Sequence, residues 1–486
     1  NSSVSTARID NLRGGAEMGS GDASPDGCRV VNPAAVQGAQ PCQGSRGRRP
    51  LVAGRSKKTV SFISSKINAL RNNKFLKGVA VLASGTAVAQ VLLPFVFMPV
   101  LSRLYGPEPR GIYGTYVVIT NITQQIACFR YDYSIVVADD DDEAGGAFVL
   151  SVGLAVLFSI AISLLTWPFV PQLGALFNLT DGAENTLWMV PLTTLICGIT
   201  TALNYFNVRH EKYKVISVAN IIRVCVMLTV QIVMGFMGAG CWGMIVGQFL
   251  SYFFGNFRMV MTLKGRIHRY MFRLDFLKKI AKKNIAYPKY MLPSAMANSF
   301  ALSMMGLVIP ARFGQTMNGY YSQINTLLGQ PLVLVSQSVS QVFLKGAAVD
   351  KHNGEKLSRT FNTVAKWLAL LSIVPFGILL LWGDPILPWF LGEEWKPITG
   401  YIKYLTPLFM VRFVVTPLTS SAIALGRQKA SMIWQFCLLA SVGIPSILSF
   451  VFSMTFEQYL LAASLPMAAA YIIFYKFCQD IVKKAK

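Results

Sequence analysis

Two arginines stand within long apolar stretches of the sequence. Arg223 lies in the stretch 214–237 and Arg412 in the stretch 399–424, and Arg412 has no acidic neighbour in its own stretch. A guanidinium presents a fixed fork of donors that binds a pyrophosphate or an acidic sugar through two hydrogen bonds at once. We therefore interpret both residues as candidates for binding an anion. The alternative for each is a structural ion pair or a contact with backbone carbonyls.

Further polar side chains occur in the other apolar stretches. Arg130 lies near the end of the stretch 111–136 beside Asp132, where a local salt bridge or snorkelling explains it equally well. The amides are candidates for lining a hydrophilic path, and hydrogen bonding between helices is the alternative. These amides are Gln90, Gln125, Asn204, Asn298 and Gln337.

The elements that carry these residues are predicted to be transmembrane helices. The chain is 53% hydrophobic and 14% charged, with a mean hydropathy of +0.47, so its apolar surface exceeds what one soluble core can cover. A span needs about 20 mostly apolar residues. We expect an all-α polytopic membrane protein with about twelve spans in two parallel six-helix bundles around a central cleft. The expected spans are 77–101, 111–136, 146–170, 186–206, 214–237, 240–262, 287–311, 319–344, 361–381, 399–424, 428–451 and 455–477.

The basic residues predict the orientation of these spans. Alternate loops are rich in Lys and Arg, as in 258–289 and in the tail 476–486, whereas the other loops carry only Arg103, Arg110, Arg312 and Lys396. Basic short loops stay on the cytoplasmic side. We therefore expect a multi-pass protein of the cell inner (plasma) membrane with both termini in the cytoplasm. Tryptophans near the ends of spans on the opposite side fit an interfacial aromatic belt.

The regions outside the spans differ in composition. Residues 1–57 lack any helical period, so we expect a disordered or artefactual segment. Residues 58–76 fit an interfacial amphipathic helix. A basic cytoplasmic linker, 263–286, would then join an N-terminal bundle, 77–262, to a C-terminal bundle, 287–480.

A short internal repeat supports two parallel bundles. Tyr105-Gly106, Gly111 and Tyr113 recur as Phe313-Gly314, Gly319 and Tyr321, each shifted by 208 positions, and the same shift pairs Gln90 with Asn298. The two copies fall on topologically equivalent loops. This is the pattern of transporters built from repeated halves, which keep their site between them.

Other functional classes lack their signatures here. The eight cysteines form no CxxC pair and no site with a histidine, which argues against a metal or other cofactor. The net charge of +23 is distributed between apolar spans and not over a soluble nucleic-acid-binding domain. No phosphate-binding GxxxxGK[ST] loop occurs. No carboxylate lies in the middle of the first two spans or the seventh, which argues against a multidrug antiporter. The outward loops are too short for the catalytic domain of a membrane polysaccharide polymerase, so we expect no enzyme.

Four segments carry a resemblance to a known family. They are LSRLYGPEPRGIYGTYVVITNITQQIACFRYDYSIVVADDDDE at 101–143, YFNVRHEKYK at 205–214, YPKYMLPSAMANSF at 287–300, and GQPLVLVSQSVSQVFLKGAA at 329–348. The first resembles the oligosaccharide flippases of the multidrug, oligosaccharidyl-lipid and polysaccharide exporter superfamily. Their second helix ends in a similar Arg-Tyr-acid-x-Ala/Ser-Ile run before an acidic loop.

The resemblance covers residues 75–480 and implies a function. Members of the family move undecaprenyl-pyrophosphate-linked oligosaccharides, such as O-antigen or exopolysaccharide repeat units, to the outer leaflet by ion-coupled alternating access. The implied partners are the lipid-linked substrate, the bilayer, and the polymerase or chain-length machinery of polysaccharide biosynthesis. The alternatives that the residues leave open are an antiporter of the same superfamily and, less favoured, a polymerase.

Overall fold

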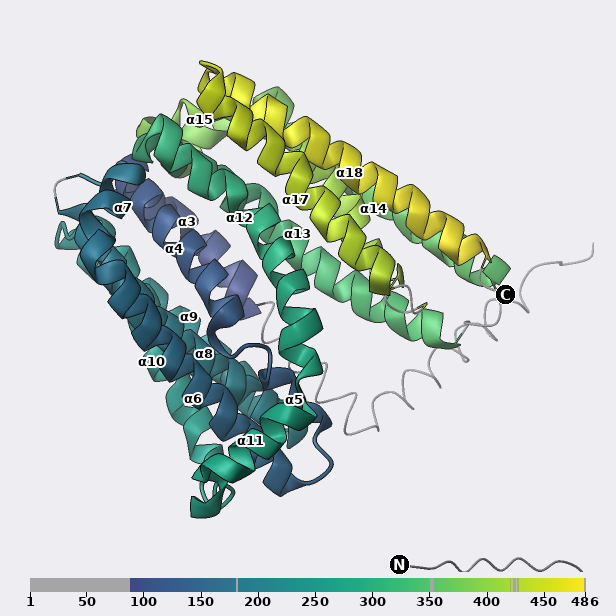
Figure 1. Ribbon diagram of the computed structural model, residues 1–486. Coiled ribbons are helices and arrows are strands. Elements are labelled where there is room, and N and C mark those ends of the chain that lie inside the picture. Colours follow the sequence, from purple (N-terminus) through teal and green to yellow (C-terminus); the bar gives the residue numbers. More distant parts are fainter. Residues whose placement is uncertain are drawn as a thin grey trace, which may run out of the picture. The chain divides into compact units, whose positions relative to one another are not determined.

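The computed structural model describes residues 88–180, 182–349, 354–419, 421–422, 425 and 428–484. Every regular element in these residues is a helix, as expected (Figure 1). The segments predicted at 1–57 and 58–76 lie outside the described residues.

The helices fall into two sets along the chain. The first set comprises η1 (Val88–Leu92), α3 (Leu93–Leu104), α4 (Pro107–Ala127), α5 (Asp132–Val137), α6 (Asp141–Thr166), η2 (Trp167–Phe169), α7 (Val170–Leu176), η3 (Ala183–Trp188), α8 (Met189–Arg209), α9 (Tyr213–Phe236), α10 (Cys241–Val260), η4 (Met261–Leu263), η5 (Arg269–Phe272) and α11 (Leu274–Lys283). The second comprises η6 (Tyr287–Met291), α12 (Leu292–Phe313), α13 (Gln315–Val349), α14 (Gly354–Leu391), η7 (Glu393–Trp395), α15 (Ile398–Leu418), α17 (Gln428–Val451) and α18 (Phe456–Lys484).

Within the described residues, eight helical segments are long and apolar enough to cross a membrane. They are Asp141–Leu176, Ala183–Arg209, Tyr213–Phe236, Tyr287–Phe313, Ser358–Leu391, Ile398–Leu418, Ala430–Val451 and Phe456–Lys483. These helices expose large apolar side chains, including Leu164 (69%), Leu381 (74%) and Val451 (70%), which a soluble protein would bury. The chain is therefore a multi-pass membrane protein, and the count of about twelve spans stays a prediction.

Small residues bring α10 against α9. Gly243, Gly247, Ser251 and Gly255 recur every four residues and share one face of α10. A Cβ atom on Gly247 would lie 2.7 Å from Cγ of Gln231, and one on Gly255 would lie 3.2 Å from Cβ of Arg223. This spacing is typical of membrane helices whose backbones approach closely. The contact fixes the face of α9 that carries Arg223.

Two glycines of the repeat allow α4 and α13 to approach closely. A Cβ atom on Gly111 of α4 would lie 1.8 Å from the carbonyl oxygen of Gln315, and one on Gly319 of α13 would lie 1.8 Å from that of Pro107. The shift of 208 positions relates Gly111 to Gly319 and Pro107 to Gln315, so the contact is reciprocal. We call this contact the glycine crossing, and the ends of the helices that carry it the Gly111 end.

Side-chain hydrogen bonds join the two sets around the glycine crossing. Asn318 is fully buried, and its Nδ2 donates to the carbonyl oxygen of Gly111 (2.8 Å) and to Oγ1 of Thr115 (2.9 Å). Beside it, Ser102 donates to the carbonyl oxygen of Leu391 (2.9 Å), and Nε1 of Trp395 donates to that of Ser102 (2.8 Å). The sets are therefore locked together at the Gly111 end.

At the opposite end of the first set, α11 docks on α6. Met271 and Ile280 pack against the start of α6, and Nζ of Lys283 lies 2.7 Å from Oδ2 of Asp139 and 2.7 Å from Oε1 of Glu143. This is the segment predicted as the basic linker 263–286. Its apolar face is covered by protein, so it is part of the folded structure.

The ion pairs of Lys283 predict that the docking of α11 depends on pH. The hydrogen bond from Lys283 lowers the pKa of the Asp139 carboxyl below its usual range. A depressed carboxyl pKa stabilises the folded contact above the unfolded pKa, and this contribution is lost as the pH falls through the folded pKa. We expect a spin label at Lys279→Cys to become more mobile as the pH drops below about 4, the usual range of aspartate. In a Lys283→Gln background, this pH dependence should disappear, and its persistence would contradict the assignment.

Candidate functional site

A cavity of about 700 Å³ lies between the two sets of helices. Its walls come from η1, α3, α4, α9 and α10 on one side and from α12, α13, α15 and Trp395 on the other. Pockets for small molecules and cofactors measure about 300 to 1,000 Å³. The cavity is therefore large enough to bind the polar part of a substantial molecule.

Arg223 lines this cavity from α9. Its guanidinium carbon lies 4.7 Å from the centre of the Tyr252 ring on α10, so the charge is held by a cation–π contact. The absence of a side chain on Gly255 lets the stem of Arg223 lie against α10, because a Cβ atom there would be 3.2 Å from Cβ of Arg223. Arg223 therefore lies on the cavity wall with its charge over the ring of Tyr252.

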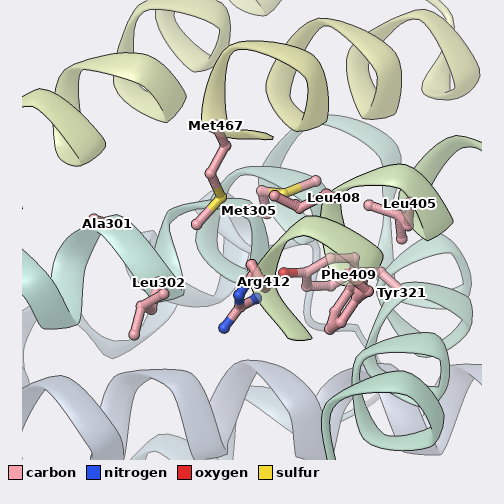
Figure 2. Close-up of a pocket in the computed structure, with 9 residues that line it drawn as sticks. All are labelled: Ala301, Leu302, Met305, Tyr321, Leu405, Leu408, Phe409, Arg412 and Met467. Atoms are coloured by element: carbon pink, nitrogen blue, oxygen red, sulfur yellow. The ribbon is translucent and has the colours of Figure 1, made fainter. Parts of the chain in front are cut away.

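Arg412 lines the same cavity from α15. Figure 2 shows the hydroxyl of Tyr321 directed toward the Arg412 side chain. The guanidinium carbon of Arg412 lies 5.2 Å from the centre of the Phe409 ring and 5.9 Å from the centre of the Tyr471 ring. A further pocket of about 10 Å³, lined by Arg412, Tyr321 and apolar side chains, has room for about one water molecule. The buried Nε of Arg412 has no hydrogen-bond partner in the described residues.

A third arginine of the cavity, Arg110, was not predicted. The sequence placed it in a loop, but α4 begins at Pro107, so Arg110 lies in its first turn. Its guanidinium carbon lies 5.5 Å from the Tyr113 ring, and its Nη2 donates to Oγ1 of Thr326 on α13 (2.9 Å). Two signals in the sequence indicate this position: Tyr113 three residues later, on the same helix face, and the repeat, which equates Arg110 with Asn318.

The charge of the cavity has one sign. Among its lining residues, Arg110, Arg223 and Arg412 are charged, and no aspartate, glutamate or lysine is present. None of the salt bridges of the described residues involves these arginines. Amides supply further hydrogen-bonding groups: Gln90, Asn121, Gln231, Gln248, Gln323, Asn325 and Gln330. Unneutralised guanidinium groups beside neutral donors and acceptors favour a ligand that carries both anionic and hydroxyl groups.

The structure brings three of the predicted site residues, Gln90, Arg223 and Arg412, to the cavity wall. Arg130 instead donates from Nη2 to Oε1 of Gln125, at the junction of α4 and α5, so these two form a pair away from the cavity lining. Asn204 and Asn298 lie on α8 and α12, also away from the lining, and Oδ1 of Asn204 is buried without a partner among the described residues. Gln337 belongs to α13, and its side chain lies outside the described part of the chain.

Comparisons with known proteins give one family and one fold. The model of a family described as "Polysaccharide biosynthesis protein" matches residues 100–399. No curated protein matches the chain. Three of the similar solved structures illustrate the fold. An inward-facing MATE family multidrug resistance transporter of the MOP superfamily is 16% identical, covering 83% of this chain and 95% of its own, with a TM-score of 0.62. The lipid II flippase MurJ in an inward closed conformation is 14% identical, covering 84% and 87%, with a TM-score of 0.61. A MOP superfamily transporter from Pyrococcus furiosus is 14% identical, covering 85% and 98%, with a TM-score of 0.55.

Proposed function

Because the chain belongs to the polysaccharide biosynthesis protein family and has the fold of the MOP superfamily transporters, we propose that it is a lipid-linked oligosaccharide flippase. It moves an undecaprenyl-pyrophosphate-linked oligosaccharide from the cytoplasmic to the outer leaflet by alternating access. The proteins that it resembles are transporters and a flippase, not enzymes. The cycle is coupled to an ion gradient.

The observation that carries this proposal is the arginine-lined cavity without a carboxylate. A pyrophosphate headgroup does not cross about 30 Å of hydrocarbon unaided, because its hydration shell would be lost without replacement. Arg110, Arg223 and Arg412 supply cations that replace that shell, and the cavity amides suit the sugar hydroxyls. The lipid tail stays in the bilayer.

The competing function is a multidrug or cation antiporter of the same superfamily. Such a protein exchanges a proton for a cationic cargo and needs a carboxylate at the site. The cavity lining contains none among the described residues, and its three arginines would repel a cation. The lining therefore favours an anionic cargo.

The topology completes the proposal. In addition to the eight apolar segments, η1 with α3, α4, α10 and α13 cross the membrane, giving twelve spans in two six-helix bundles, 77–262 and 287–480. Both termini and α11 face the cytoplasm, the Gly111 end faces outward, and polymerase or chain-length proteins act on the product there.

We test this orientation with single cysteines in a variant whose eight native cysteines are replaced. Glu393 and Lys279 are exposed, on η7 and on α11. We expect Glu393→Cys to react with a membrane-impermeant maleimide added outside intact cells, and Lys279→Cys to react only after the membrane is opened. Labelling of both positions from one side would rule out this topology.

The decisive experiment on function removes the protein from its native host. We expect the lipid-linked oligosaccharide to accumulate on the cytoplasmic leaflet, measured by accessibility to a membrane-impermeant glycan-modifying probe, and re-expression to restore export. If the oligosaccharide reaches the outer face normally while sensitivity to cationic drugs rises, the antiporter function replaces the flippase.

A further inference from the structure

Arg110 belongs both to the cavity and to the contact that closes its Gly111 end. It lines the cavity from α4, next to Gly111, which forms the glycine crossing. Its bond to Thr326 runs from α4 to α13. The equivalent residue of the other half, Asn318, donates across the same contact in the opposite direction. Among the hydrogen bonds that join the two sets, these two come from equivalent positions of the repeat and run in opposite directions.

The two donors differ in what else they can bind. Asn318 is fully buried beneath the crossing. Arg110 has a guanidinium on the cavity wall, and its Nε has no hydrogen-bond partner in the described residues. Nε and Nη2 form one edge of the guanidinium fork, and Nη2 is the atom that holds Thr326. An oxyanion that takes this edge bidentately therefore engages the atom that also bridges α4 to α13.

From this geometry we propose that the Arg110–Thr326 bond is a latch that couples anion binding to opening of the glycine crossing. The inference rests on the proposed anionic cargo. A guanidinium binds an anionic phosphate through two parallel bonds between opposite charges, which is stronger than its single bond to the neutral hydroxyl of Thr326, so a bound headgroup draws Arg110 away from Thr326. The crossing then loses one of the hydrogen bonds between α4 and α13 at the moment when the cargo is in place. Thr326 is a positioning residue in this scheme, because it acts through Arg110.

If the latch exists, removing the Thr326 hydroxyl changes the affinity for pyrophosphate. If Thr326 has only a structural role, this affinity stays the same. Binding and opening are linked, so the cargo gives up part of its binding free energy to break the latch. In Thr326→Val, that contact is already absent. We expect inorganic pyrophosphate to bind the purified full-length variant about tenfold more tightly than wild type by isothermal titration calorimetry, the equivalent of about 1.5 kcal/mol for a hydrogen bond with one charged partner.

Opening is measured directly with a pair of spin labels. Glu108 and Thr316 are exposed beside the crossing and are related by the shift of 208 positions. In a variant without native cysteines, we expect pyrophosphate to shift the distance distribution between labels at Glu108→Cys and Thr316→Cys toward longer values. Thr326→Val should shift it partly without ligand. Melting temperatures confirm that each variant is folded, and Thr326→Ala replaces the valine variant if that one is unfolded.

Thr406→Val is the matched control. Thr406 is buried in α15 and donates to the carbonyl oxygen four residues earlier, as Thr326 does, but it does not line the cavity. The affinity of Thr406→Val for pyrophosphate, and the distance between the labels at positions 108 and 316, should equal those of the wild type. Three results would overturn the latch and leave the flippase function standing. Thr326→Val could bind pyrophosphate no more tightly than wild type, or Thr406→Val could bind it as tightly as Thr326→Val does. The distance between the labels at positions 108 and 316 could also stay the same when pyrophosphate binds. No binding of pyrophosphate to wild type would overturn both.

Discussion

Arg223→Ala and Arg412→Ala are each expected to abolish or severely reduce export of the lipid-linked oligosaccharide while the protein still folds. The two residues come from opposite walls of the cavity, α9 and α15, so each engages the headgroup from its own side. Loss of one charge-assisted contact costs about 1.5 to 3 kcal/mol, which is about ten- to over a hundredfold in apparent affinity. Export is measured as oligosaccharide on the outer leaflet. Expression and melting temperature should stay near wild type, because neither arginine has an ion-pair partner in the described residues.

Two further substitutions make this test specific. Lysine at either position should restore export only in part, because it keeps the charge and loses the fork. Arg312→Ala removes the same charge from α12, where Nε donates to the carbonyl oxygen of Ser449 outside the cavity lining, and it should leave export near normal. If an alanine variant at 223 or 412 exports normally, or fails to export only because it is unfolded, that arginine has a structural role and does not bind the headgroup.

Gly111→Ala and Gly319→Ala are expected to force the glycine crossing apart. Each added Cβ would lie 1.8 Å from a backbone carbonyl oxygen, which cannot move without shifting a helix. Overpacking in a tight contact costs about 1 to 3 kcal/mol. We expect a lower melting temperature, loss of export, and a longer distance between labels at positions 108 and 316, to a similar degree in both variants because the contact is reciprocal.

Glycines in open space provide the control for the crossing. A Cβ on Gly153 of α6 or on Gly377 of α14 meets no atom within 4 Å. Alanine at either position should be neutral or stabilise its helix by up to about 1 kcal/mol. Two results would contradict a reciprocal contact that holds the two sets together. Gly111→Ala could have the same melting temperature as Gly153→Ala, or only one of Gly111→Ala and Gly319→Ala could be affected.

The sequence predicted the all-helical membrane fold and the family correctly, because both follow from long apolar runs and from recognisable segments. It located Arg223, Arg412 and Gln90 because a polar group inside an apolar run stands out. It missed Arg110 because that residue lies where a loop becomes a helix, and a charge there resembles an interfacial anchor. The positions of Arg130 and Asn204 could not be inferred, since which face of a helix meets the cavity depends on packing between helices distant in sequence.

The distance along the chain between the two glycines of the crossing affects how the protein is made. At about 5 to 20 residues per second, α13 leaves the ribosome roughly 10 to 40 seconds after α4. During that interval, the Gly111 face of α4 is not yet covered by α13. The hydroxyl of Thr115 lies 3.2 Å from the carbonyl oxygen of Gly111 in the same helix, so this polar pair satisfies itself without a partner. Asn318 has no such local acceptor among its contacts here, but α4 is already in place when it arrives. Asn318, which needs hydrogen-bond acceptors from another helix, is thus synthesised second, when its acceptors on α4 already exist.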